Sequence, residues 1–120
     1  MKKMKFGNLS LLALAAVALA ASGAVFAQQG VSKDEIRIGT IQDLSGPLAG
    51  FGKQSRNGMQ LAVDEINEQG GINGRKLKLF VEDSGYDPKK AVLAAQKLVN
   101  QDKIFIMAGH IGTAQNMAAM

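Results

Sequence analysis

The residues of this chain that could do chemistry gather in a short loop, 109–113, made of small and polar residues. The loop follows an apolar stretch and precedes the first turns of a helix. A helix start presents unpaired backbone N–H groups and a partial positive charge, so a carboxylate is a natural guest there. Gly112 leaves room for close backbone approach, and the Thr113 hydroxyl can add a hydrogen bond. The alternative, compatible with the first, is that Thr113 only caps its own helix.

A second glycine-rich loop, residues 43–52, follows the first apolar strand. Gly46-Pro47 makes a rigid turn in it, and Phe51 supplies an apolar ring just before the next helix. This ring either covers the hydrocarbon part of a ligand or belongs to the core. The loop departs from a phosphate-binding loop, because Pro47 and Gln54 stand where that motif needs glycine and a hydroxyl residue. Nucleotide binding is therefore not predicted.

The sequence offers no clear catalytic or metal-binding constellation. His110 is the only histidine and there is no cysteine, so a zinc site is not predicted and we interpret His110 as a structural group. The acidic stretch 82–87 lacks the EF-hand spacing. We interpret it as a solvated loop that ends in a helix N-cap, with calcium binding as the alternative and with Tyr86 able to reach the rim of a cleft. We predict no enzyme activity, no catalytic residue, no metal and no cofactor.

Hydrophobic periodicity predicts the elements that position these loops. Residues 36–42 and 76–83 have strand patterns, and the continuous apolar run 104–108 is typical of a strand buried on both faces. One amphipathic helix ends at Gly70-Gly71. A second begins at Asp87-Pro88, with Asp at the N-cap and Pro in the first turn. The apolar stripes of these two helices are Met59, Ala62, Val63 and Ile66, and Ala91, Ala94, Ala95 and Leu98.

The alternation of strands and helices predicts the topology. A β-α-β-α-β order implies a parallel sheet with right-handed crossovers. Two lysines on one face of 76–83 indicate an edge strand, whereas 104–108 has the pattern of a central one. The predicted fold is therefore α/β, with a parallel sheet in the order 2-1-3. The chain then reverses direction between strands 1 and 3, so loops 43–52 and 109–113 meet at the switch point, where small ligands bind.

Residues 1–27 have the composition of a secretory signal peptide. Three lysines precede an apolar run. Residues 25–27 then place small or modest side chains at the positions that a signal peptidase reads, which predicts cleavage after Ala27. A membrane anchor is the alternative, but the run is shorter than the ~20 residues that a span needs. No cysteine stands at the cleavage point to carry a lipid. We therefore expect a soluble protein of the periplasm.

The net charge and the length of the chain limit which partners and which domain organisation the sequence predicts. The net charge of +4 falls to +1 without the three lysines of the signal. No basic stripe interleaved with aromatic residues is present, so a nucleic-acid partner is not predicted. Residues 28–120 fall below the commonest domain size and stop within a helix start. We interpret them as the truncated N-terminal part of a ligand-binding lobe.

A combination of motifs resembles one known family. The segments that carry the resemblance are 38–39, 45–52, 57–58, 64–67, 70–75, 87–88 with Ala91, and 109–110. Together they resemble the start of the periplasmic leucine/isoleucine/valine-binding proteins. Those are the substrate-binding proteins of branched-chain amino acid ABC importers. The resemblance covers essentially all of residues 28–120.

The resemblance implies a type I periplasmic-binding-protein fold, in which two α/β lobes joined by a hinge close on a ligand. In that family the loop after the third strand binds the ligand carboxylate. This role falls on Gly112 and Thr113, with Ile111 lining the pocket, while Phe51 matches an aromatic that shields the ligand. The serine-rich stretch and the disulfide of the best-known members are missing here, so the ligand need not be leucine. Relatives carry amides, urea or aromatic carboxylates.

We therefore expect the solute-binding component of an ABC importer, which captures a branched-chain amino acid or a related small carboxylate or amide in the periplasm. Its partners would be that ligand and a membrane permease. The alternative is the ligand-sensing ectodomain of a receptor with the same fold, which would continue into a transmembrane helix. A secreted hydrolase is a third hypothesis, but Thr113 has no nearby base in the sequence. Residues 28–120 alone would offer one wall of a two-walled cleft and are expected to bind poorly.

Overall fold

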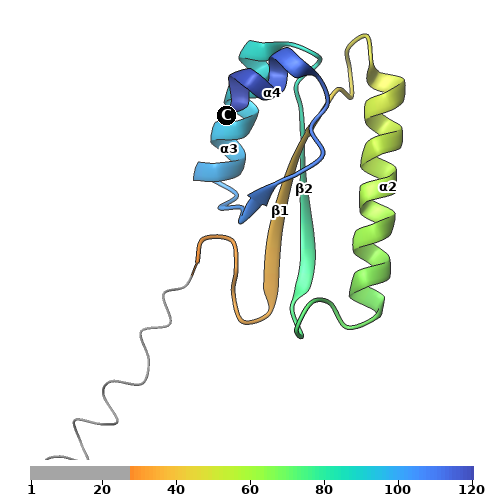
Figure 1. Cartoon of the computed structure of the whole chain (residues 1–120), viewed down its shortest axis with the longest axis vertical. Helices are drawn as coiled ribbons and strands as arrows, with labels where there is room; N and C mark the ends of the chain where they lie inside the picture. Colours follow the sequence, from red (N-terminus) through yellow and green to blue (C-terminus); the bar gives the residue numbers. More distant parts are fainter. Residues whose placement is uncertain (1–27) are drawn as a thin grey trace, which may run out of the picture.

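The computed structural model describes residues 28–120, and the predicted signal peptide at 1–27 lies outside them. The elements in this part of the chain are β1 (Glu35–Gln42), α2 (Ala49–Glu68), β2 (Lys76–Asp83), α3 (Pro88–Asn100), β3 (Ile106–Met107) and α4 (Thr113–Ala119). The strands form a parallel sheet in the order β2-β1-β3 (Figure 1). The predicted α/β class and strand order are confirmed.

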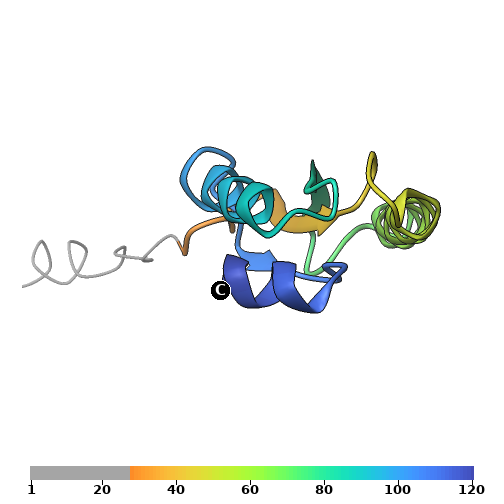
Figure 2. The same ribbon diagram turned by 90° about the horizontal axis from the view of Figure 1, so that it is seen from above.

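The register of the sheet assigns its residues to two faces. β1 runs alongside β2 from the pair Glu35–Lys76 to the pair Gln42–Asp83, and it meets β3 at Ile38–Ile106 and Gly39–Met107. Paired residues of parallel strands point to the same face, and neighbours along a strand point to opposite faces. Figure 2 shows α2 and α3 on opposite sides of the sheet. Each face of β1 therefore has a helix above it.

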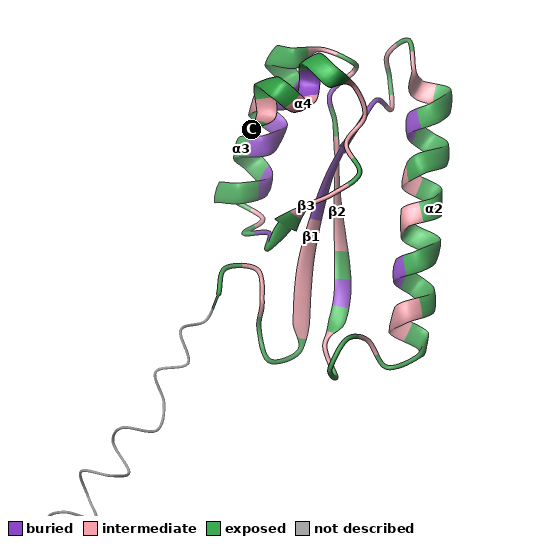
Figure 3. Cartoon of the chain, in the orientation of Figure 1, coloured by how far each residue is buried: buried purple, intermediate pink, exposed green. Residues whose placement is uncertain are grey.

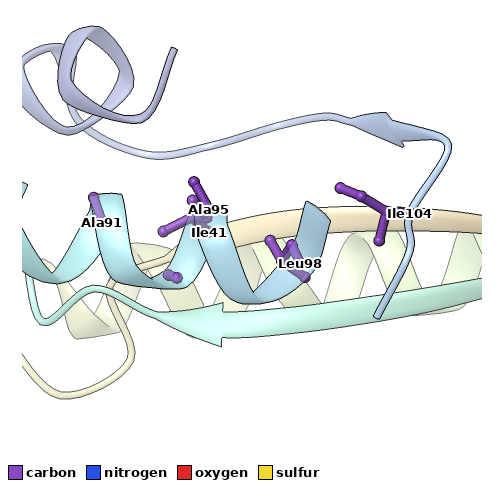
Figure 4. Packing of buried hydrophobic residues seen from close by; sticks show 6 residues of the cluster. Ile41, Ala91, Ala95, Leu98 and Ile104 are labelled. Atoms are coloured by element: carbon purple, nitrogen blue, oxygen red, sulfur yellow. The ribbon is translucent and has the colours of Figure 1, made fainter. Parts of the chain in front are cut away.

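The core lies between α3 and the sheet. Its buried residues are Ile41, Ala91, Ala94, Ala95, Leu98 and Ile104 (Figure 4). Gly39 belongs to the same face, because a Cβ at this position would lie 2.7 Å from the Ile104 Cδ1 atom. Figure 3 shows burial concentrated on the carboxyl half of β1 and on the face of α3 that covers it. The small alanines let α3 approach the sheet closely, as their spacing predicts.

Helix α2 begins earlier than its pattern predicts. The Asp43 carboxylate is fully buried and accepts hydrogen bonds from the backbone N–H groups of Gly46 (2.5 Å) and Leu48 (2.6 Å). These bonds compress residues 43–48 into a tight turn, and the helix starts at Ala49. The prediction that Phe51 precedes the helix is wrong, because Phe51 is the third residue of α2.

The third strand is shorter and more exposed than predicted. β3 covers only Ile106–Met107, and the exposed fractions of Phe105 and Ile106 are 43% and 49%. Within residues 28–120, β3 pairs with β1 alone, so it lies at the edge of the sheet in this part of the chain. Only Ile104 is fully buried in the apolar run 104–108. The prediction of a central third strand buried on both faces is wrong for this part of the chain, and β1 is the central strand.

The predicted edge strand and the predicted start of α3 are both confirmed. β2 lies at the edge of the sheet, where the side-chain amide of Asn67 accepts from the Leu77 N–H (2.7 Å) and donates to the Leu77 carbonyl (2.8 Å). Asp87 is the N-cap of α3 and accepts from the backbone N–H of Lys89 at 2.7 Å. None of the helices within residues 28–120 combines the length and apolar character that a membrane span requires.

Candidate functional site

Three loops gather at the carboxyl edge of the sheet, the upper end in Figure 1. Loop 43–48 follows β1, loop 84–87 follows β2, and loop 108–112 leads from β3 to α4. In an open parallel sheet this edge, at the point where the strand order reverses, is where ligands bind. The sequence predicts the meeting of the first and third loops, and the structure adds the second.

The third loop is fastened to β1 along its length. The backbone N–H of Ala108 donates to the Gly39 carbonyl at 2.9 Å, and that of Ile111 donates to the Ile41 carbonyl at 3.2 Å. The buried Gln42 side chain adds a bond from its Nε2 to the Gly109 carbonyl at 2.5 Å. The loop therefore continues the pairing of β3 with β1 beyond the end of the strand, which leaves Ile111 half-buried.

His110 completes this attachment, and its interpretation as a structural group is confirmed. Its Nδ1 accepts a hydrogen bond from the backbone N–H of Ile41 at 3.0 Å, and its Nε2 lies 3.2 Å from the Met107 Sδ. An accepting Nδ1 requires the neutral imidazole with its proton on Nε2. Burial lowers the pKa of His110 below its ordinary value, which favours the same neutral form.

Gly112 and Thr113 lie at the start of α4. Gly112 has φ 98° and is the N-cap, while Thr113 is the first helical residue and makes no capping hydrogen bond. The alternative that Thr113 caps its own helix is therefore wrong. Its side chain is exposed. The first amides of a helix have no intrahelical acceptor, so the start of α4 offers backbone donors next to the exposed Thr113.

Phe51 lies at the start of α2, at the same edge of the sheet (Figure 1). Phe51 is 69% exposed, so the alternative that it belongs to the core is wrong. The third loop approaches α2, because a Cβ built on Gly109 would lie 3.1 Å from the Met59 Sδ. Two helix starts, one with an apolar ring and one with polar donors, thus flank the loop that β1 holds in place.

The acidic stretch after β2 joins the first two loops. Asp83 accepts from the backbone N–H groups of Leu44 and Gly85, both at 2.8 Å, and from the Ser45 hydroxyl at 2.6 Å. Desolvation by itself raises the pKa of Asp83, but these hydrogen bonds outweigh it and the pKa lies below its usual value. Among residues 28–120 the structure shows no group of three or more metal-ligating side chains.

Two buried glutamines at this edge were missed by sequence reasoning. Gln42 and Gln115 are 0% and 4% exposed, and Gln115 donates from its Nε2 to the Tyr86 carbonyl at 2.7 Å. Hydropathy assigns glutamine to the surface, so only position gives a signal. Gln42 ends a buried strand, and Gln115 lies in the first turn of a helix beside a glycine N-cap.

A pocket of about 540 Å³ opens beside this site but does not include the predicted ligand residues. It lies between the end of α3, the third loop and α4, and its lining residues are Val99, Met107, Ala108, Gly109, His110, Asn116, Ala119 and Met120. Phe51 and Thr113 lie outside it. The exposed surface at the strand ends, which carries Phe51 and Thr113, is separate from this pocket.

Comparison with known proteins gives consistent matches. A family model described as "Periplasmic binding protein" matches residues 35–120. A leucine-, isoleucine-, valine-, threonine- and alanine-binding protein of Pseudomonas aeruginosa is 36% identical over 116 residues, which is 97% of this chain and 30% of the relative. The curated relatives that are matched are named as binding proteins.

Solved structures agree with these sequence matches. A fatty acid ABC transporter substrate-binding protein from Thermomonospora curvata has a TM-score of 0.72 and 34% identity, over 75% of this chain and 23% of its own. A branched-chain amino acid transporter substrate-binding protein from Streptococcus pneumoniae, in complex with isoleucine, has a TM-score of 0.68 and 35% identity, over 72% and 25%. The chain spans between about a fifth and a third of the length of the curated relatives it matches.

Proposed function

The chain belongs to the periplasmic binding protein family, and on this premise we propose that it is a solute-binding component of an ABC importer. The resemblance predicted from its sequence motifs is thereby confirmed at the level of the family. We further propose that it captures its ligand without catalysis, by closure of two lobes of which residues 28–120 form part of the first. Closure is a population shift that contacts in the closed state drive.

The observation that carries this proposal is the contrast between the fixed backbone and the open surface of the third loop. Hydrogen bonds from β1 hold Ala108, Gly109 and Ile111, whereas the Thr113 side chain is exposed. A prearranged loop loses little freedom on binding, and such preorganisation raises affinity. We assign the ligand carboxylate to Gly112 and Thr113, the pocket lining to Ile111, and the shielding of the ligand to Phe51.

The ligand class that we propose is a branched-chain amino acid or a related small carboxylate or amide. The names of the relatives support a shared chemistry, because leucine, isoleucine, valine and fatty acids all join a carboxylate to an apolar chain. This chemistry suits one polar and one apolar helix start at a common edge. A hydrogen bond to a charged group contributes about 1.5–3 kcal/mol, so Thr113 alone can account for roughly 10- to 150-fold in affinity.

The location and partner follow from the same proposal. A periplasmic protein would leave the cytoplasm through the signal peptide predicted at residues 1–27 and would deliver its ligand to a membrane permease. The family description supports the periplasm. Secretion can be tested by fractionation of cells that express the chain with and without residues 1–27, because only the complete chain should reach the periplasm.

Isothermal titration calorimetry on the full-length protein tests the binding function. The panel contains leucine, isoleucine, valine, hexanoate, acetamide and 3,4-dihydroxybenzoate. Thr113→Val should lower the affinity for carboxylates at least tenfold and the affinity for acetamide less. Phe51→Ala should lower the affinity most for ligands with long apolar chains. Leu93→Ala is the matched control, because Leu93 is exposed on α3. If no compound of the panel binds, the proposal is contradicted.

A further inference from the structure

We propose that Gln115 is a positioning residue for the ligand loop, and this inference rests on the proposed function. Its side-chain amide ties loop 84–87 to the start of α4 and thereby sets where Gly112 and Thr113 stand. Gln115 acts through these two residues rather than by contact with the ligand.

The first observation is the burial of a polar side chain in an otherwise open helix. Gln115 is 4% exposed and is the only buried residue of α4 in the described part of the chain. Its Nε2 donates to the Tyr86 carbonyl at 2.7 Å across 29 positions of sequence. An apolar residue would fill this place without the cost of desolvating an amide. The amide is therefore explained by the bond that it makes rather than by burial.

The second observation is that the bond closes a circuit of hydrogen bonds around the ligand loop. Gln42 holds the start of the loop through the Gly109 carbonyl, and the Gln42 carbonyl accepts from the Ser84 backbone N–H at 2.9 Å and from the Ser84 hydroxyl at 3.2 Å. The Ser84 hydroxyl in turn accepts from the Tyr86 N–H at 3.2 Å. Gln115 links Tyr86 to the far end of the loop. Both ends of the loop are thus connected by hydrogen bonds to Gln42, the last residue of β1.

The third observation is the packing of Gln115 against Gly112. A Cβ at Gly112 would lie 2.1 Å from the Gln115 Oε1 and 3.0 Å from the Tyr86 Cε2. The N-cap glycine thus packs against the side chains of the two residues that the bond joins. Tyr86 has φ 61°, a left-handed conformation that is uncommon for a residue with a side chain. Release of its carbonyl would free Tyr86 and Gly112 to move together.

Hydrogen–deuterium exchange and calorimetry on the full-length protein test this role. Gln115→Met keeps the volume and removes the donor, and Gln115→Glu keeps the shape and replaces the donor by an acceptor. Gln96→Met is the matched control, because Gln96 is exposed on α3. In both Gln115 variants the backbone amides of 109–113 should exchange faster than in the wild type, whereas the exchange protection of the β1 amides should not change. Isoleucine affinity should fall about tenfold if the competent loop population falls to a tenth.

A saturating concentration of isoleucine separates positioning from a general loss of stability. Ligand that selects the competent loop should restore wild-type exchange at 109–113 in Gln115→Met. Wild-type exchange and wild-type affinity in both Gln115 variants would overturn the proposal, and so would equally faster exchange throughout β1. If the wild-type protein binds no panel compound, the proposed function fails, whereas the exchange of 109–113 still decides whether Gln115 positions the loop.

Discussion

Replacement of Gly52 by alanine is expected to destabilise the fold although it improves helix propensity. Gly52 is buried in the first turn of α2 and packs on the backbone of Asp43. A Cβ at this position would lie 1.9 Å from the Asp43 carbonyl oxygen and 2.7 Å from its carbon. Both neighbours are backbone atoms of a fully buried residue, so no flexible side chain can move away.

The magnitude follows from three contributions. Overpacking costs typically 1–3 kcal/mol. Any shift of Asp43 weakens the bonds that its carboxylate accepts from Gly46 and Leu48, and an unsatisfied buried group costs about 1–3 kcal/mol. The gain in propensity from glycine to alanine is about 1 kcal/mol. The free energy of unfolding should therefore fall by about 3 kcal/mol.

Gly50 offers a matched control in the same turn of α2. A Cβ at Gly50 meets no atom within 4 Å, and the same is true of Gly58 farther along the helix. Gly50→Ala and Gly58→Ala should each raise the free energy of unfolding by about 0.5–1 kcal/mol. Urea denaturation followed by circular dichroism measures all three variants. The reasoning is refuted if Gly52→Ala is as stable as Gly50→Ala.

Three further predictions concern the loops and caps. Because burial lowers the pKa of His110, the unfolded chain takes up the proton first. The stability that neutral His110 contributes is full above about pH 6.5 and is lost as the pH falls from there through the folded pKa. Wild type and His110→Gln, unfolded in urea between pH 4.5 and 8, should differ in this slope. The pKa of Asp83 is also lowered from its ordinary value of 3.8. The stability that ionised Asp83 contributes is therefore present above pH 3.8 and is lost as the pH falls through the folded pKa. NMR titration of the carboxyl groups should show the lowered pKa in the wild type and no such titration in Asp83→Asn. Asp87→Ala removes the cap of α3 and should lower the free energy of unfolding, measured by thermal unfolding, by about 1 kcal/mol. Asp34→Ala is the control, because Asp34 is exposed and lies before β1. An equal loss in Asp34→Ala would contradict the capping role of Asp87.

Local patterns predicted those parts of the fold that are decided locally. The alternation of 76–83 gave the bounds of β2, and Asp87-Pro88 gave the start of α3, because period-2 burial and N-capping act over a few neighbouring residues. The start of α2 could not be read in this way. The group that compresses the preceding turn is Asp43, a buried carboxylate six residues before the helix, and nothing local marks it as buried.

The missed parts of the site have a similar cause. A glutamine is polar in any scale, so the burial of Gln42 and Gln115 depends on partners that are distant in sequence. The short β3 shows the opposite error, because a continuous apolar run reports what a strand can bury but not what covers it. Phe105 and Ile106 are exposed, and β1 is the only strand next to β3 within residues 28–120.

The division between supporting and exposed residues determines how the site can be tested. Residues that hold the loops, such as Gln42 and Asp43, are buried and hydrogen-bonded, so their substitution changes stability and binding together. Phe51 and Thr113 are exposed and contribute little to packing, and exposed substitutions usually alter stability by no more than about 0.5 kcal/mol. A tenfold loss of affinity in Thr113→Val corresponds to about 1.4 kcal/mol, well above that range. Binding measured on these two variants therefore reports on the ligand surface, and an equal fall in stability would mean that Thr113 supports the fold instead.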